Sequence, residues 1–239
     1  MKKTIIIVGC LFTSIALAAT ENKEFDGSGL EILSIKNPSG DVKIGVSKDG
    51  KAYVAAEKIK FGKNCTLKMD KSGRELVVEV SKGGIFNTDD CKVNFDVKVP
   101  REIALHLKSG SGDLEVNGTK GTVDFKIGSG DAKVTAEVDT LDGMSGSGSV
   151  VATGLSGNAN VRTGTGDVTL TYGSAPSKGE LDIKTGSGDA TIFFPSSMKV
   201  LTDFKAGSGR VYNELGDSED ARFKVSMKAG SGDLKIKKL

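Results

Sequence analysis

The sequence predicts an all-β protein, a single elongated β-solenoid of roughly ten coils with two short strands in each coil. Three observations predict this class. A glycine-rich turn recurs at nearly constant spacing, apolar and polar residues alternate on both sides of each turn, and aromatic residues make up only 5% of the chain, with no Trp. A thin aliphatic core between stacked strands needs few large rings, and no segment has a convincing helical pattern.

The N-terminus has the pattern of a secretory signal peptide. Two lysines precede an apolar run over residues 5–17, which ends in small residues at Ala16 and Ala18. This predicts a cleaved signal peptide at 1–18 and an exported protein that is periplasmic, secreted or on the cell surface. The run is too short for a membrane span and no other long apolar segment follows, so no integral membrane span is expected. Lipidation at Cys10 is the alternative, although it would leave a very short apolar region.

Removal of the leader balances the charge. The chain has 33 Lys and Arg against 31 Asp and Glu, and two of these lysines lie in the leader, so the mature chain has 31 of each. A balanced chain gives no electrostatic reason to expect a nucleic-acid partner.

Two cysteines remain after cleavage, Cys65 and Cys91. An even pair in an exported chain predicts a disulfide, which would close a loop of about 27 residues. Two free buried thiols are the alternative. Two cysteines and one histidine make a poor zinc set.

The exported domain, 19–239, divides into a less regular part at 19–100 and regular coils at 101–239. Alternating residues predict two or three strands in 30–59 and two more at 74–81 and 91–99. The second of these last two places Val93, Phe95, Val97 and Val99 on one face. The stretch 82–90, rich in Gly and Asp, is expected to be a loop that the disulfide would pin.

The repeat is clearest at the last residue of each Gly-Ser-Gly-Asp-like turn. Successive turns end 18, 18, 18, 22, 21 and 23 residues apart, and Asp41 ends an earlier, weaker copy 72 residues before Asp113. The residues one and three places after each end are apolar with one exception, and a second alternating stretch precedes each turn, as at Val123, Phe125 and Ile127. Such units bury their apolar faces only by stacking. The turn ends are Asp113, Asp131, Ser149, Asp167, Asp189, Arg210 and Asp233.

Glycine at these corners has a physical reason. A chain that turns sharply in every coil needs positive φ or close backbone approach, and Ser or Asp can satisfy nearby amides. Calcium binding is the rival interpretation, because calcium-binding β-rolls also carry glycine-aspartate turns. It is disfavoured because the nine-residue step is missing and Ser149 and Arg210 replace the acid. The residues assigned to the corners are Asp41, Gly110, Gly112, Asp113, Gly128, Gly130, Asp131, Gly164, Gly166, Asp167, Gly186, Gly188, Asp189, Gly207, Gly209, Gly230, Gly232 and Asp233.

The order "IKNPSGDVKI", "VKVPREIALHLKSGSGDLEV" and then serial "GSGD" turns resembles the bacterial "putative adhesin" or Toastrack family of β-solenoid domains. The resemblance runs from about Leu30 to Ile236 and rests on corner and core residues. It implies an envelope or extracellular module, adhesive or stress-related, and no catalytic residue.

Catalytic motifs are missing from the sequence. His106, the single histidine, alternates with Ile103, Leu105 and Leu107 and is expected on the solvent face. No nucleophile elbow, phosphate loop or HExxH occurs, and no cofactor is expected. A carbohydrate-active solenoid with paired carboxylates is the enzymatic alternative. The tyrosines that could line a sugar groove, Tyr53, Tyr172 and Tyr212, are isolated in sequence.

One stretch has a local basic excess, and its cations are candidates to contact anionic envelope polymers or phosphorylated lipids. Lysine-blunted strand edges are the plainer interpretation. The expected function is a non-enzymatic adhesin-like surface that binds an envelope component or surface polymer, or associates with itself end to end or along an edge. An envelope-stress or antimicrobial-sensing module is the alternative. The cations are Lys58, Lys60, Lys63, Lys68, Lys71 and Arg74.

Overall fold

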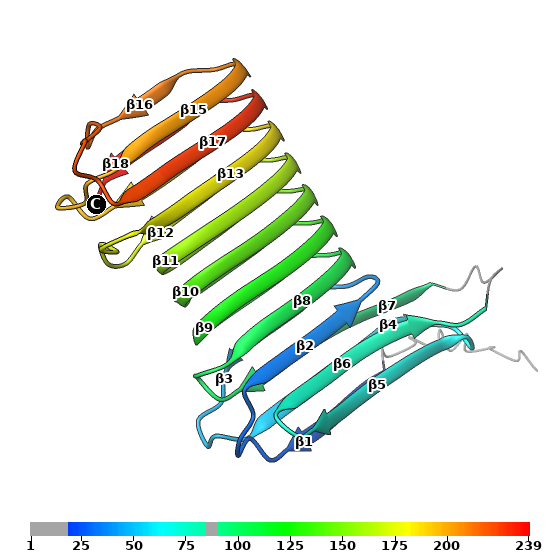
Figure 1. Ribbon diagram of the computed structural model, residues 1–239. Helices are drawn as coiled ribbons and strands as arrows, with labels where there is room; N and C mark the ends of the chain where they lie inside the picture. Colours follow the sequence, from blue (N-terminus) through cyan, green and yellow to red (C-terminus); the bar gives the residue numbers. More distant parts are fainter. Residues whose placement is uncertain (1–18, 85–89) are drawn as a thin grey trace, which may run out of the picture.

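The computed structural model describes residues 19–84 and 90–239 (Figure 1). The signal peptide expected at 1–18, with Cys10, and part of the expected loop lie outside the described residues. Over the described ranges the chain forms strands and no helix, so none of them holds a helix that could cross a membrane.

The strands are short at the two ends of the chain and long in its centre. They are β1 (Ala19–Phe25), β2 (Ile32–Asn37), β3 (Val42–Val46), β4 (Ala52–Phe61), β5 (Cys65–Ser72), β6 (Glu75–Lys82), β7 (Cys91–Val99), β8 (Ala104–Ser111), β9 (Leu114–Ser129), β10 (Ala132–Ser147), β11 (Val150–Thr165), β12 (Val168–Tyr172), β13 (Gly179–Ser187), β14 (Ala190–Phe194), β15 (Leu201–Ser208), β16 (Val211–Asn213), β17 (Phe223–Ser231) and β18 (Leu234–Lys238).

The strands stack along one axis to form the predicted all-β solenoid (Figure 1). Strand segments that precede a glycine turn form face A: β5, β6, β2, β8, the second halves of β9, β10 and β11, then β13, β17 and β15. The remaining strand segments form face B, from β1 and β4 at one end to β18 and β16 at the other. Pairing is parallel except where β1, β4 and β5 close the N-terminal end.

Two short strands per coil was too simple for the centre of the molecule. Strands β9, β10 and β11 are 16 residues each and pass around the corner opposite the glycine turn without a break. Register shifts between Thr135 and Thr140 absorb the bend. The two faces therefore join in one 18-stranded sheet.

Coils do not stack in chain order. The coil of β2 and β3 lies directly beside that of β8 and β9, although Asp41 and Asp113 are four repeat lengths apart in sequence. At the other end, β17 and β18 insert between the coil of β13 and β14 and that of β15 and β16. Any coil edge offers the same backbone donors and acceptors, so local sequence does not decide which coil is the neighbour.

The core is the predicted aliphatic column. The apolar residues after each turn are buried in every coil but the one that holds Val211, which is 39% exposed because β16 pairs on one side only. The tyrosines differ in their surroundings. Tyr172 is fully buried, with its ring 4.5 Å from that of Phe194, while Tyr212 is 48% exposed.

The predicted disulfide is present. Cys65, the first residue of β5, is bonded to Cys91, the first residue of β7, with Cα atoms 5.7 Å apart. The inward residues predicted for β7, Val93, Phe95 and Val97 among them, are buried. The bond ties face A to face B at the less regular end of the solenoid.

Candidate functional site

The glycine turns form one straight corner in which backbones lie too close for side chains. At Gly130 the backbone has φ +128°, and a Cβ would lie 2.2 Å from the carbonyl oxygen of Gly112 in the neighbouring coil. The first glycine of the same turn, Gly128, lacks positive φ, yet its Cβ would lie 2.4 Å from the oxygen of Gly110. Both positions therefore require glycine because neighbouring coils stack so closely.

The last residue of each turn bonds the next coil through what we call the Asp column. In each step a side-chain Oδ1 accepts the backbone N–H of the corresponding residue one coil along. The steps run from Asn94 to Asp41, Asp41 to Asp113, Asp113 to Asp131, Asp131 to Ser149, Asp167 to Asp189, Asp189 to Asp233 and Asp233 to Arg210, at 2.7–3.0 Å.

The two turn ends that are not aspartate lie at different places in the Asp column. Arg210 ends the Asp column, because no strand in the described part of the chain pairs with the other edge of β16. Ser149 interrupts it, because no described side chain accepts the N–H of Asp167. Asn94, which the repeat pattern missed because it lies within β7 and not in a glycine turn, begins the column.

These carboxylates act as backbone acceptors. The N–H of Asp233 and then the ammonium of Lys235 lower the pKa of Asp189 below its ordinary value. Over residues 19–84 and 90–239, no three His, Cys, Asp or Glu side chains group as a metal would require. The corner aspartates thus have a structural role as acceptors of backbone N–H groups in the next coil.

The histidine lies where the alternation predicted. His106 is exposed on face A, with Nδ1 3.6 Å from Oδ2 of Asp124 on the next strand. Both side chains are about half exposed to solvent, at 46% and 53%. No enclosed site surrounds the pair.

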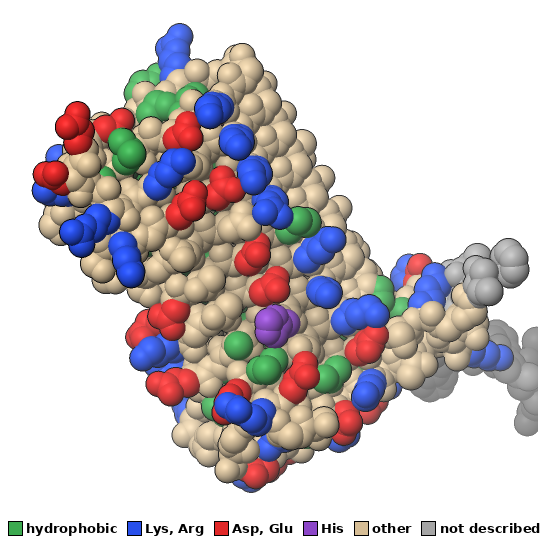
Figure 2. All heavy atoms as spheres, viewed as in Figure 1, with side chains coloured by type: hydrophobic (Ala, Val, Ile, Leu, Met, Phe, Trp, Pro, Cys, Tyr) green, Lys and Arg blue, Asp and Glu red, His purple; other side chains and the backbone are tan. Residues whose placement is uncertain are grey.

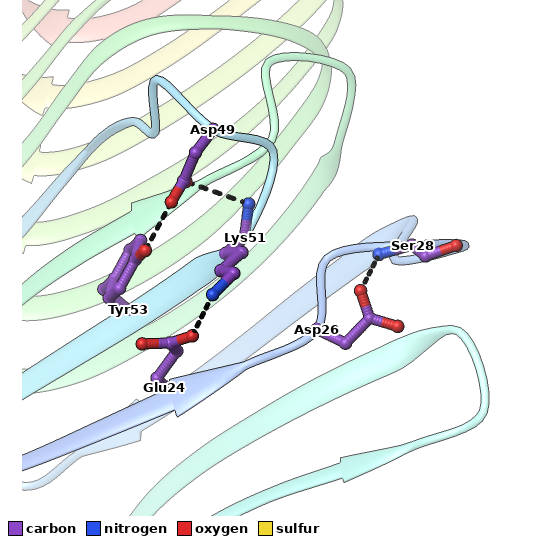
Figure 3. A network of polar contacts seen from close by, with 6 residues as sticks. All are labelled: Glu24, Asp26, Ser28, Asp49, Lys51 and Tyr53. Atoms are coloured by element: carbon purple, nitrogen blue, oxygen red, sulfur yellow. Dashed lines mark hydrogen bonds and ion pairs between the residues drawn. The ribbon is translucent and has the colours of Figure 1, made fainter.

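A polar network at the N-terminal end holds loops together (Figure 3). Asp49 accepts the Tyr53 hydroxyl at 2.5 Å and the Lys51 backbone N–H, and the Lys51 ammonium pairs with Glu24. The hydrogen bond from Tyr53 lowers the pKa of Asp49, and that bond raises the pKa of Tyr53. Both directions move the groups away from titration near neutral pH, so the network suits a structural tie.

The predicted basic stretch is not one cluster. Lys58 and Lys60 lie on β4 of face B, whereas Lys68 and Lys71 lie on β5 of face A. Several of its cations are neutralised locally: Lys58 by Glu21 at 2.7 Å, Lys60 by Asp90 at 3.0 Å and Arg74 by Glu31. Lys63 stands in the exposed turn between the two strands.

A different set of cations is aligned on face A. The residues five places before each turn end stand opposite one another in successive strands, and we call them the basic column. Figure 2 shows blue side chains that follow one another along the solenoid axis, beside a row of red ones. In stacking order the basic column is Lys36, Lys108, Lys126, Met144, Arg162, Lys184, Lys228 and Lys205.

Two further columns flank it. Two places earlier on the same strands lies a polar column, and three places later lies an exposed hydroxyl column at the glycine corner. The polar column is Ser34, His106, Asp124, Asp142, Asn160, Asp182, Ser226 and Asp203. The hydroxyl column is Ser111, Ser129, Ser147, Thr165, Ser187, Ser231 and Ser208.

Shallow grooves run between the basic column and the glycine corner. Two of them have volumes of about 440 Å³ each and adjoin at Lys126 and Gly128, which line both. Together they extend from the coil of Lys36 to the coil of Lys184. The sequence carried a signal for this site, because a Lys or Arg stands five places before nearly every turn end.

Comparison with solved structures gives distant likenesses. A "putative cell adhesion protein" from Clostridium sporogenes is 17% identical over 93% of this chain and 100% of its own, with a TM-score of 0.43. A "putative adhesin" from Bacteroides fragilis is 14% identical over 92% and 97%, with a TM-score of 0.40. A "putative adhesin" from Parabacteroides distasonis is 12% identical over 93% and 98%, with a TM-score of 0.43.

No functionally curated protein matches the chain in sequence. The profile of the family described as Toastrack DUF4097 matches residues 22–238, which is nearly the whole described chain. The corner and core motifs from which the resemblance was inferred lie within that match. The chain therefore belongs to the Toastrack DUF4097 family.

Proposed function

We propose that this chain is a non-enzymatic, exported protein of the bacterial cell envelope whose long strand faces form an adhesin-like binding or structural surface. One observation carries the proposal. Face A presents columns of polar and charged side chains in register from coil to coil, over a regular scaffold. Repeat proteins use such faces for contacts that are spread over many coils.

The disposition of acids and bases supports binding over catalysis. A glycosidase needs two carboxylates that flank a bound sugar in different environments. Here Asp124 and Asp142 stand directly opposite each other on neighbouring strands, and Asp124 is 53% exposed. A general acid also needs a raised pKa, which burial normally supplies. This facing pair of carboxylates on face A provides the enzymatic test.

The experiment is incubation of the purified chain with envelope fractions, with both bound protein and released sugar measured. We expect retention on the envelope without sugar release. Sugar release that is lost in Asp124→Asn or Asp142→Asn would replace the proposal with a carbohydrate-active enzyme. If the chain is not retained and no sugar is released, the envelope-stress or antimicrobial-sensing alternative is favoured.

Export is tested separately by the intact mass of protein recovered outside the cytoplasm. We expect loss of residues 1–18 and of two hydrogen atoms for the disulfide between Cys65 and Cys91. A diacylated mass that begins at Cys10 would show lipidation instead.

A further inference from the structure

We propose that the basic column binds an extended anionic polysaccharide whose chain runs parallel to the solenoid axis. Carboxylate, sulfate or phosphate groups of successive sugars would meet successive cations of the column. The inference rests on the proposed binding function and names the class of ligand and its direction.

The alignment of the cations is the first support. Neighbouring strands lie about 4.8 Å apart, so the eight positions of the basic column span roughly 34 Å. Like charges directly opposite one another destabilise a sheet. Seven cations in eight consecutive positions therefore oppose folding, and an anionic chain laid along them would relieve the repulsion.

Several of these cations remain available to a ligand. Lys36, Lys184 and Lys205 approach carboxylates of Glu79, Asp182 and Asp203 at 2.8, 3.0 and 3.8 Å. The others, Lys108, Lys126, Arg162 and Lys228, have no ion pair with any residue in the described part of the chain. Free and paired cations are interspersed along the basic column without a regular order.

The groove beside the column suits a narrow polymer. Its lining includes the exposed glycines Gly128, Gly146 and Gly164. The hydroxyl column lies on the far side of these glycines and could exchange hydrogen bonds with sugar hydroxyls. Cations of the basic column line one side of the groove and the glycine corner lines the other, and the exposed hydroxyls lie beyond that corner.

Two other anionic partners fit this face less well. A planar lipid surface would meet the polar column as well, where Asp124, Asp142 and Asp182 would be repelled. Single-stranded nucleic acid binds by stacking bases on aromatic side chains, and no residue that lines the two grooves is aromatic.

The test is titration of the purified chain with polygalacturonate oligomers of increasing length at low salt, followed by calorimetry. Dextran is the neutral control, and single-stranded DNA and anionic vesicles represent the other partners. We expect affinity to rise with length until the oligomer reaches roughly 34 Å, and then to level off because the column ends. Affinity should also fall with salt, because counterions are released on binding.

The variant pair is Lys126→Gln with Arg162→Gln, matched by Lys43→Gln with Lys133→Gln. The second pair removes the same charge from exposed positions of face B. We expect the first pair to weaken polygalacturonate at least tenfold and the second to change it less than twofold. Met144→Lys, which fills the gap in the column, should strengthen binding.

Equal losses in both pairs, no polygalacturonate binding, equal binding of dextran, or tighter binding of DNA or vesicles would each overturn the inference. The proposed function has its own readout. If the first pair of substitutions leaves retention on envelope fractions unchanged, the anionic polysaccharide is rejected as the ligand and the binding function stands. If neither the unaltered chain nor any variant is retained, both the ligand and the binding function are rejected.

Discussion

Alanine at Gly130 should strongly destabilise the solenoid. The new Cβ would lie 2.2 Å from the Gly112 oxygen, and the backbone there has φ +128°. Forcing atoms into packed space costs about 1–3 kcal/mol, and holding a non-glycine residue in a rare backbone region costs about 1–3 kcal/mol. We therefore expect Gly130→Ala to lower the free energy of unfolding by roughly 2–6 kcal/mol.

Three other substitutions separate the two causes. Gly73 has φ +58° with open space around its Cβ position, so Gly73→Ala reports the backbone cost alone. Gly128→Ala reports the steric cost alone, because its Cβ would lie 2.4 Å from Gly110 without positive φ. Lys126→Val changes an exposed strand position and should stay within about 0.5 kcal/mol.

The assay is urea unfolding at 25 °C, followed by circular dichroism, with the slope of free energy against urea compared among variants. The expected order of destabilisation is Gly130→Ala first, then Gly128→Ala and Gly73→Ala, then Lys126→Val. If Gly130→Ala and Lys126→Val cost the same, the corner is not packed as described and the physical explanation of the repeat is wrong.

Three further predictions concern stability. Ser149→Asp should add about 0.5–1.5 kcal/mol, because it supplies the missing acceptor for the N–H of Asp167; an unchanged urea midpoint would contradict the Asp column. Reduction of the bond between Cys65 and Cys91 should cost roughly 3–4 kcal/mol on the chain-entropy expectation, with a double Cys→Ala variant, insensitive to reductant, as control. Hydrogen bonds from the N–H of Asp233 and the ammonium of Lys235 lower the folded-state pKa of Asp189. Its contribution to the free energy of unfolding is therefore present above the ordinary aspartate pKa of about 4 and is lost as the pH falls through the folded value. Asp189→Asn should therefore flatten the acid side of the stability curve, and an unaltered acid slope would refute the linkage.

The repeating unit of this fold follows from residues that are near one another along the chain. Alternation on both sides of each turn depends on neighbours along the chain, so it correctly placed the buried face of β7 and the exposed His106. Glycine at the corners was predicted for positive φ and close backbone approach, and the contact of Gly130 with Gly112 shows both.

The order of the coils was decided only by the tertiary structure. Backbone donors and acceptors are the same on every coil edge, so nothing local shows that β2 pairs with β8 or that β17 lies between β13 and β15. This order determines which side chains meet. It places Asn94 at the start of the Asp column and Arg210 at its end. It also divides the basic stretch from Lys58 to Arg74 between two faces. The distant lysines of the basic column are aligned, because a column forms only when equivalent positions of stacked coils come into register.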